Sequence, residues 1–202
     1  EDGGIEFSNQ GVGLVTVLNA VATNGDIYID NQLGSIDAVG QVVAADGIAG
    51  LVAFEGGVQG SPTGLVKGGF VGLGAGLGVG SVSRVRVEAE VIVVVGEMGP
   101  VNVLSLMDGD VALGQLYSGS GGVLFDHVGV GTLALVDVLV EEGDARFTTT
   151  FADISVEGLL ELIDGDLTLD SSSEVGGLGD VVVGGKLEIL AATGIGGLDA
   201  LQ

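Results

Sequence analysis

Short runs of apolar residues recur along the chain at a spacing of about 21 residues, and Gly, Asn and Asp residues stand between them. The runs are Ile27–Ile29, Leu51–Phe54, Phe70–Val71, Val91–Val95, Val111–Leu113, Leu133–Leu135, Ile154–Val156 and Val181–Val183. A fixed period of this size indicates stacked structural repeats. We therefore predict an all-β fold, a parallel β-solenoid (β-helix) of about 21 residues per coil and roughly nine coils, in a single domain over residues 1–202.

The polar residues between the runs predict the corners of each coil. Asn-Gly and Asp-Gly pairs, which are strong turn formers, occur at 24–25, 46–47, 108–109 and 164–165. The strands between such corners are too short to be stable alone, but coils stacked about 4.8 Å apart pair every strand with its neighbours. Only Val156–Ile163 has a pattern that also fits a helix.

Acidic residues often precede the apolar runs, and their spacing predicts one irregularity. Asp26, Glu90, Asp110, Asp153 and Asp180 occupy such positions. The last interval is 27 residues, which exceeds one coil. The polar segment Asp170–Glu174 lies in this interval, so we expect a polar loop insertion near residues 170–177.

Other apolar architectures fit the pattern less well. A membrane β-barrel alternates over about 10 residues and carries aromatic girdles, which this sequence lacks. A β-sandwich spaces its strands by about 8–12 residues and predicts no persistent coil period. The uncharged stretch Gly68–Ser83 has GxxxG spacing, but it is shorter than the roughly 20 residues that a helical span needs and is rich in glycine. We therefore expect no membrane insertion.

The composition limits the classes of partner that the chain is expected to bind. Its 28 Asp and Glu residues against five Lys and Arg give a net charge of −23, which repels nucleic acid and anionic membrane surfaces. Aromatic residues make up only 4% of the glycine-rich sequence, which favours a narrow aliphatic interior over a cofactor pocket. We expect the partners to be copies of the chain itself, divalent cations and glycans. A plainer interpretation is that the acidic excess keeps an apolar surface soluble.

Four segments resemble the coils of a known group of proteins. Gly25–Ile29, Gly34–Ile36, Asp110–Leu113 and Gly165–Leu169 resemble the "G-D-I-x-L … G-x-I" coils of filamentous-haemagglutinin-like exoproteins, which autotransporter passengers share. The resemblance implies a right-handed β-helix in an extracellular or cell-surface location. The amino-terminal secretion domain of that family, with its Asn-Pro-Asn-Gly signature, is missing from the sequence. The chain is therefore expected to be a segment of such a protein or a distinct structural protein with the same coil.

The residues that could carry catalysis do not form a strong pattern. His127, the only histidine, follows Asp126, but neighbours in a strand point to opposite faces. We predict a solvated or turn histidine without a catalytic role. A polysaccharide-cleaving β-helix would need Asp108, Asp110, Asp164 and Asp166 together with Arg84, Arg86 or Arg146. The structural alternative pairs Arg84 and Arg86 with Glu88, Glu90 or Glu97, and we predict that the chain is not an enzyme.

Calcium is the one cofactor for which the sequence contains candidate ligands. Acidic residues that recur at one corner of successive coils would lie about 5 Å apart, close enough to share a divalent ion. The candidates are Asp26, Asp108, Asp110, Asp164, Asp166 and Asp180. Gly176–Val182 partly resembles a calcium-binding nonapeptide, but its Asp falls one place early and the motif occurs once. Diffuse counter-ions around stacked acids are the default interpretation.

Taken together, these features predict a structural role. Neither end of the sequence carries an obvious cap, so we expect that the chain continues or that copies stack on one another. We expect an extracellular protein that associates end to end or side by side as a filament, sheath or surface-layer element. The alternative is the shaft of an adhesin that binds glycans or a host surface, with Ser171–Ser173 and the region from Lys67 to Gly80 as binding patches.

Overall fold

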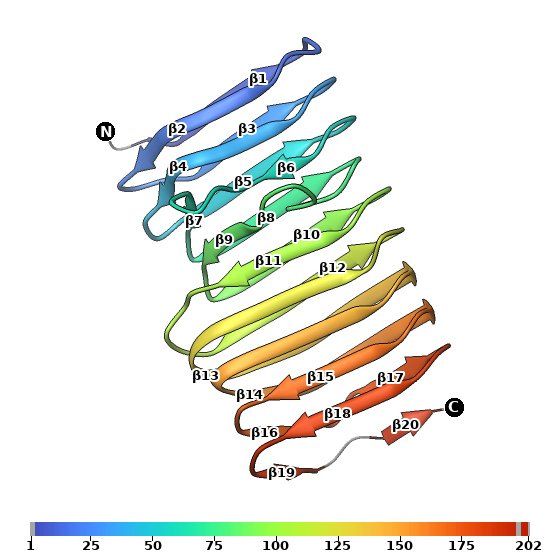
Figure 1. Ribbon diagram of the computed structural model, residues 1–202. Helices are drawn as coiled ribbons and strands as arrows, with labels where there is room; N and C mark the ends of the chain where they lie inside the picture. Colours follow the sequence, from blue (N-terminus) through green and yellow to red (C-terminus); the bar gives the residue numbers. More distant parts are fainter. Residues whose placement is uncertain (1–2, 197–198, 202) are drawn as a thin grey trace.

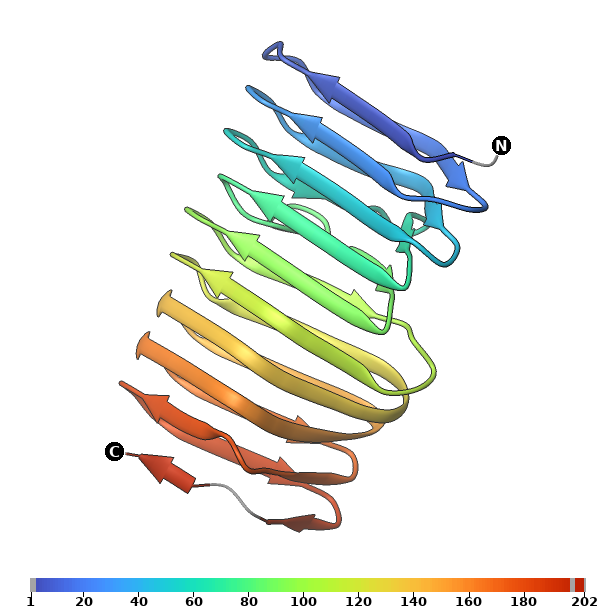
Figure 2. The same cartoon turned by 180° about the vertical axis from the view of Figure 1, so that it is seen from behind.

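The computed structural model describes residues 3–196 and 199–201 and has parallel strands throughout. The strands stack as a β-solenoid of about nine turns with about 22 residues per turn, without helix. The predicted fold class is thus confirmed, with a period closer to 22 than to 21. Figures 1 and 2, seen from opposite sides, show that each turn crosses two layers of strands.

We call the two layers the first and the second ladder. The first ladder contains β1 (Ile5–Asn9), β3 (Ile27–Asn31), β5 (Ile48–Ala53), β8 (Phe70–Ala75), β10 (Val91–Gly96), β12 (Val111–Ser118), β16 (Glu174–Gly177), β17 (Asp180–Val183), β19 (Gly194–Ile195) and β20 (Asp199–Leu201). The second ladder contains β2 (Val15–Ala22), β4 (Ile36–Ala44), β6 (Val58–Gln59), β7 (Leu65–Lys67), β9 (Val85–Glu88), β11 (Val101–Ser105), β15 (Leu167–Ser171) and β18 (Leu187–Ala191). The long strands β13 (Val123–Glu142) and β14 (Ala145–Asp164) bend at one corner and contribute to both ladders.

The core lies between the two ladders and consists of aliphatic side chains stacked coil upon coil. Leu51 pairs with Ile29 on one side and with Leu73 on the other, and Leu73 pairs with Val94. All four side chains are buried. Because strand residues alternate between faces, every second residue joins such a stack and the remaining residues face outward.

Small irregularities interrupt the alternation. The register between β10 and β12 shifts at Ile92/Val93, so that Leu113 and Leu116 are both buried although they are three residues apart. A shift of this kind is a β-bulge, which inserts one extra residue into one strand. The bulges explain why the spacing of apolar residues in the sequence varies from coil to coil.

The predicted turn pairs lie at corners, where glycine is needed. Gly25, Gly109 and Gly165 have φ values of 137°, 124° and 143°, a region that favours glycine. At Gly165, a Cβ atom would also lie 2.2 Å from the carbonyl oxygen of Gly143 in the preceding coil. The corner therefore requires glycine both for its backbone conformation and for the close approach of two coils.

Three segments test the sequence predictions. Val156–Ile163 lies within β14, so a helix there is wrong. Gly68–Ser83 contains β8, and among the described residues no helix is long and apolar enough to cross a membrane. Residues 170–177 do not protrude as an inserted loop, because β15 and β16 pair with β14 in the ladders. The interval of 27 residues arises because Asp180 is aligned with Leu159 and not with Asp153, so it stands six residues further along its coil than Asp153 does.

Candidate functional site

The acidic residues at the corners hold successive coils together. Asp26 Oδ1 accepts a hydrogen bond from the Ile48 amide at 2.8 Å, and Asp110 Oδ1 accepts one from the Thr132 amide at 3.0 Å. Asp166 Oδ1 likewise accepts the Lys186 amide at 2.7 Å. Each carboxylate thus binds a backbone N–H group of the next coil, which the strand ladder leaves unpaired at a corner. This role explains why acidic residues precede so many apolar runs.

Asp153 shows the same arrangement with an additional donor. Its Oδ1 accepts the Glu174 amide at 3.0 Å. A hydrogen bond from the Ser173 hydroxyl, followed in importance by this amide, lowers the pKa of the Asp153 carboxyl. The charged form of Asp153 is therefore the one that the neighbouring coil stabilises.

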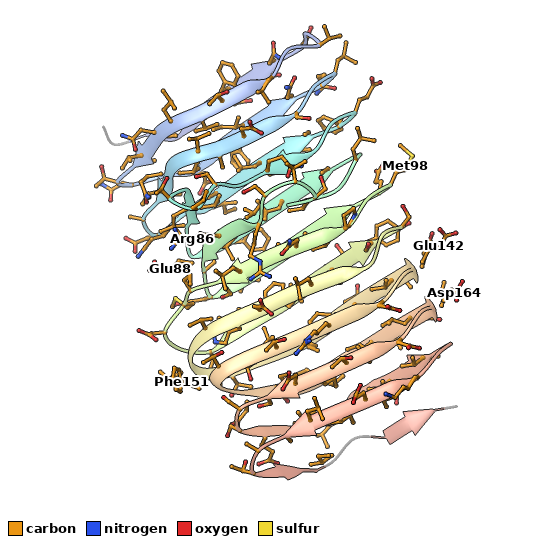
Figure 3. All side chains as sticks on the ribbon, in the orientation of Figure 1. Arg86, Glu88, Met98, Glu142, Phe151 and Asp164 are labelled. Carbon is orange, nitrogen blue, oxygen red and sulfur yellow. The ribbon has the colours of Figure 1, made fainter. Side chains whose placement is uncertain are left out.

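The six predicted calcium ligands are not brought together. Asp108 and Asp110 lie in the connection from β11 to β12, whereas Asp164 lies at the opposite edge with Glu142 and Met98 (Figure 3). Asp166 follows Asp164 before β15; Asp180 begins β17, and Asp26 precedes β3. Within the part of the chain that the structure describes, no group of three or more His, Cys, Asp or Glu residues could hold a metal ion. The prediction that these acids stack at one shared corner is therefore wrong, while binding of calcium to the chain stays a prediction.

His127 is buried, so the prediction of a solvated or turn histidine is wrong. Its side chain is 0% exposed, and Nδ1 lies 3.1 Å from the hydroxyl oxygen of Ser105. Nε2 is buried and has no hydrogen-bond partner among the described residues. Burial lowers the pKa of the imidazole, against a smaller opposing effect of the Asp108 carboxylate. The neighbouring Asp126 points outward, as expected for adjacent strand residues, and binds Arg84.

A row of buried polar side chains continues from His127 through the coils. Ser105, His127, Thr149 and Ser171 occupy paired positions on successive second-ladder strands. Thr149 Oγ1 and Ser171 Oγ donate to the carbonyl oxygen of Ala152 at 2.6 and 2.9 Å. The row satisfies backbone groups where β14 bends from one ladder to the other, and it gives the predicted serine patch a structural role.

The five basic residues all lie along the second ladder. They are Lys67, Arg84, Arg86, Arg146 and Lys186, in or next to β7, β9, β14 and β18. Arg84 binds Asp126 at 2.7 Å and Arg146 binds Asp170 at 2.6 Å. Lys67 and Lys186 pair with Glu88 and Glu188. We call the outward side of this ladder the charged face; its exposed pairs contribute at most about 1 kcal/mol each.

The predicted arginine partners need correction. Arg84 reaches Asp126, two coils away, and also donates to Asn102 Oδ1 at 2.7 Å. Arg86 donates to the Pro62 carbonyl at 2.6 Å, so neither arginine binds the acids proposed for it. The chain reaches across coils here because strand neighbours on one outward face come from successive turns and not from adjacent sequence.

The outward side of the first ladder has a different character. The strands β5, β8, β10 and β12 contain no charged residue. Their outward residues, which we call the valine face, are Ile48, Gly50, Val52, Phe70, Gly72, Gly74, Val91, Val93, Val95, Ala112, Gln115 and Tyr117. Exposed acids lie at both ends of these strands: Asp46, Glu55, Glu90, Glu97 and Asp110. The period of the apolar runs does not reveal this separation of charged and apolar faces.

Two of the shallow grooves on the described surface are lined by three or more charged residues. One of about 330 Å³ is lined by Asp153, Glu157 and Glu174 among others. A second of about 260 Å³ contains Arg146 and Asp166 of the alternative polysaccharide-cleaving site. In the second groove, Asp166 already accepts the Lys186 amide and Arg146 already binds Asp170. Arg84, Arg86, Asp108 and Asp110 do not line it.

The proposed adhesin patches are also dispersed. Ser171 is buried, and Ser172 Oγ accepts the Phe151 amide at 2.7 Å. Lys67 belongs to the second ladder, whereas β8, within the same proposed region, belongs to the first. The two segments therefore do not form one continuous binding surface.

Comparison of the chain with protein-family models, with curated proteins and with solved structures finds no match. The resemblance to filamentous-haemagglutinin-like coils therefore rests on the coil motifs alone.

Proposed function

We propose that this chain is a structural β-solenoid that associates with copies of itself as a filament, sheath or surface-layer element outside the cell or on its surface. The observation that carries the proposal is that the polar residues best placed for chemistry instead bind neighbouring coils or lie inside the core. Asp26, Asp110 and Asp166 bind the backbone of the next coil, and His127 stacks inside the core. The residues best suited to chemistry thus contribute to the cohesion of the stack.

The shape of the molecule suits a spacer or a building block. About nine turns at about 4.8 Å per turn give a stack about 40 Å long. Its strands pair continuously from coil to coil on both ladders, so bending the stack would disturb many hydrogen bonds together. A stiff stack of this kind can hold other parts at a fixed distance, and this role needs no binding cavity.

Charge sets the conditions under which copies would associate. A net charge of −23 opposes association at low ionic strength. Salt shortens the Debye length from about 30 Å at 0.01 M to about 3 Å at 1 M, and divalent cations neutralise acids more effectively still. We therefore propose cations as partners in assembly and glycans as neutral surface partners. An acidic chain of this kind would avoid nucleic acid and anionic membranes.

Electron microscopy of the purified chain tests this function. The chain would be imaged in low salt, in high salt and with millimolar calcium, and with magnesium as a matched divalent cation. We expect ordered filaments or sheets when cations are added and their loss when a chelator or dilution removes the cations. Isolated short rods under every condition would contradict self-association and favour the adhesin shaft instead.

A further inference from the structure

The ring of Tyr28 lies over a glycine of the next coil. Tyr28 of β3 pairs with Gly50 of β5, and a Cβ atom at Gly50 would stand 3.0 Å from Cδ1 and 3.4 Å from Cε1 of the ring. Gly50 is buried, whereas Tyr28 is 46% exposed. Side chains of a strand usually stand away from the sheet. Because Gly50 has no side chain, the Tyr28 ring covers it with one side and presents the other side to solvent.

A groove of about 250 Å³ connects this ring with Phe54, which directly follows β5 and is 53% exposed. A second groove of about 230 Å³ shares Val52 and Phe54 with the first and continues past Gly74 to Glu97. Together they cross the neighbouring strands β3, β5, β8 and β10, which follow one another along the stack (Figure 1). We call the combined surface the aromatic groove; the residues that matter below are Tyr28, Asp30, Gln32, Val52, Phe54 and Glu97.

Hydrogen-bond acceptors lie beside the exposed ring. Asp30 Oδ2 accepts hydrogen bonds from Ser8 Oγ at 2.8 Å and from Gln32 Nε2 at 3.3 Å, which hold the carboxylate in place. Asp30 Oδ1 and Gln32 Oε1 have no hydrogen-bond partner among the described residues, and both side chains line the groove. The groove therefore offers an aromatic surface and oriented oxygen acceptors to the same ligand.

This combination matches the chemistry of a neutral sugar. A pyranose ring carries C–H groups on its faces, which the electron-rich face of an aromatic ring attracts, and hydroxyl groups at its rim, which donate to carboxylate and amide oxygens. An anionic ligand would meet Asp30 and Glu97 without a basic partner, because among the described residues neither Lys nor Arg lines the groove. A purely apolar ligand would bury the Asp30 carboxylate without replacing its water.

We propose that the aromatic groove binds a neutral oligosaccharide, with one sugar ring stacked on Tyr28, its hydroxyls on Asp30 and Gln32, and the following sugars over Phe54 toward Glu97. The proposal rests on the glycan partner of the proposed function and names its site, and it does not require self-association. A sugar residue with its linkage takes up about as much length as one coil, about 4.8 Å, so successive sugars meet successive coils.

The shape of the groove sets the expected affinity. The groove is shallow and open, so a bound oligosaccharide keeps one side in water, unlike a ligand enclosed in a deep pocket. We therefore expect a weak single site, with a Kd of about 1 mM. Neutral hydroxyls and an aromatic ring carry the contact, so this affinity should change little with salt, in contrast to the association of copies.

Tyrosine fluorescence tests the site directly, because the chain has two tyrosines and no tryptophan. In the Tyr117→Phe variant, Tyr28 is the one remaining tyrosine, so its emission reports on the groove. The variant would be titrated with neutral hexamers of glucose, mannose and N-acetylglucosamine, and with a galacturonate hexamer as the anionic control. We expect a saturable change with at least one neutral hexamer and none with the anionic one. No saturable change with any neutral hexamer up to about 10 mM, or stronger binding of the anionic hexamer, would overturn the proposal.

Variants of the natural chain, measured by calorimetry with the hexamer that binds, test the individual contacts. Tyr28→Ala should weaken binding about tenfold, the loss typical of an aromatic anchor, whereas Tyr28→Phe keeps the stacking ring and most of the affinity. Asp30→Ala should weaken it about tenfold through the lost acceptor. Gly50→Ala should weaken it several-fold, because the added Cβ displaces the Tyr28 ring. The control is Phe151→Ala, which removes an exposed aromatic at a distant corner (Figure 3) and should leave binding unchanged.

The controls separate this site from the proposed function. Circular dichroism and thermal melting check that each variant folds, and binding of natural strength by a folded Tyr28→Ala variant, or an equal loss in Phe151→Ala, would overturn the aromatic groove. Cation-dependent filaments without oligosaccharide binding would overturn the groove and leave self-association standing. Oligosaccharide binding by a chain that stays monomeric in every salt would support the groove and overturn self-association.

Discussion

The imidazole of His127 lies beside the hydroxyl of Ser105 one coil earlier, with 3.1 Å between Nδ1 and Oγ, and both side chains are fully buried. The two residues are 22 positions apart, which is one turn of the solenoid. A titratable group therefore sits inside a core that is otherwise mostly aliphatic, and its protonation is linked to the stability of the coils around it.

We predict that acid destabilises the chain through His127. Burial lowers its pKa in the folded chain, so the unfolded chain binds the proton first as pH falls. The stability contributed by the neutral imidazole is complete above the ordinary His pKa of about 6.5 and is lost as pH falls from there to the folded pKa. Each tenfold difference in proton affinity between the two states corresponds to about 1.4 kcal/mol.

The measurement compares urea unfolding at pH 7.5 and pH 5 for the natural chain and for His127→Gln. The glutamine does not titrate, while the carboxylates contribute equally to both proteins. The natural chain should lose about 1 kcal/mol more than the variant between these pH values. An equal loss in the two proteins would show that His127 does not carry the effect.

The corner carboxylates should contribute to stability as hydrogen-bond acceptors. Asp110→Ala removes the acceptor of the Thr132 amide, and we expect a loss of about 1 kcal/mol in the free energy of unfolding. Asp110→Asn keeps an oxygen acceptor and should lose less. Asp37→Ala is the control, because no side-chain hydrogen bond of Asp37 is found in the described part of the chain. If Asp110→Ala behaves like Asp37→Ala in chemical denaturation, the corner role is wrong.

At position 151, glycine should give a more stable protein than alanine, which is the reverse of the usual order in strands. Its φ is 72°, the one positive φ of a non-glycine residue among those described, and its side chain is 73% exposed. An L-residue in this region costs roughly 1 kcal/mol that glycine avoids. We expect Phe151→Gly to be about 1 kcal/mol more stable than Phe151→Ala.

The same pair of substitutions at Leu159, an exposed residue of β14, provides the comparison. There alanine should be more stable than glycine by about 0.5 to 1 kcal/mol. Thermal melting of the four variants measures both differences. The same order at the two positions would refute the assigned strain at Phe151.

Divalent cations should stabilise the chain through screening. The described acids form no group of three or more that could hold a metal ion, and several have an oxygen engaged by a backbone amide. We therefore expect equal concentrations of calcium and magnesium to raise the melting temperature by similar amounts. A rise with calcium alone, reversed by a calcium chelator, would instead show that the chain binds calcium at a specific site.

The sequence predicts the solenoid because its period is carried by many residues at once. Each coil repeats an apolar run and a glycine corner, so individual irregularities do not hide the repeat. The sequence also contains the information that His127 is buried. It lies two residues after the buried Phe125, on the same face of the strand, and one turn away from Ser105 and Thr149. The prediction of a solvated or turn histidine is wrong because it rests on the polarity of the side chain and not on its place in the alternation.

Other features depend on information that the period does not contain. The β-bulge at Ile92/Val93 changes which residues of β12 face outward, and the spacing of the apolar runs does not show where such a shift occurs. Asp153 pairs with Thr132 near the start of the first-ladder part of β14, whereas Asp180 pairs with Leu159, which lies six residues after Asp153 in the same strand. The separation of the charged face from the valine face likewise requires the assignment of each strand to a ladder, which the spacing of the runs leaves open.

The most direct test of self-association is sedimentation velocity of the unmodified chain over a range of protein concentration and salt. We predict a monomer at low salt and a concentration-dependent shift to dimers or larger assemblies as salt is raised, because screening removes the repulsion between copies. A single monomeric species at every concentration and salt would contradict the account.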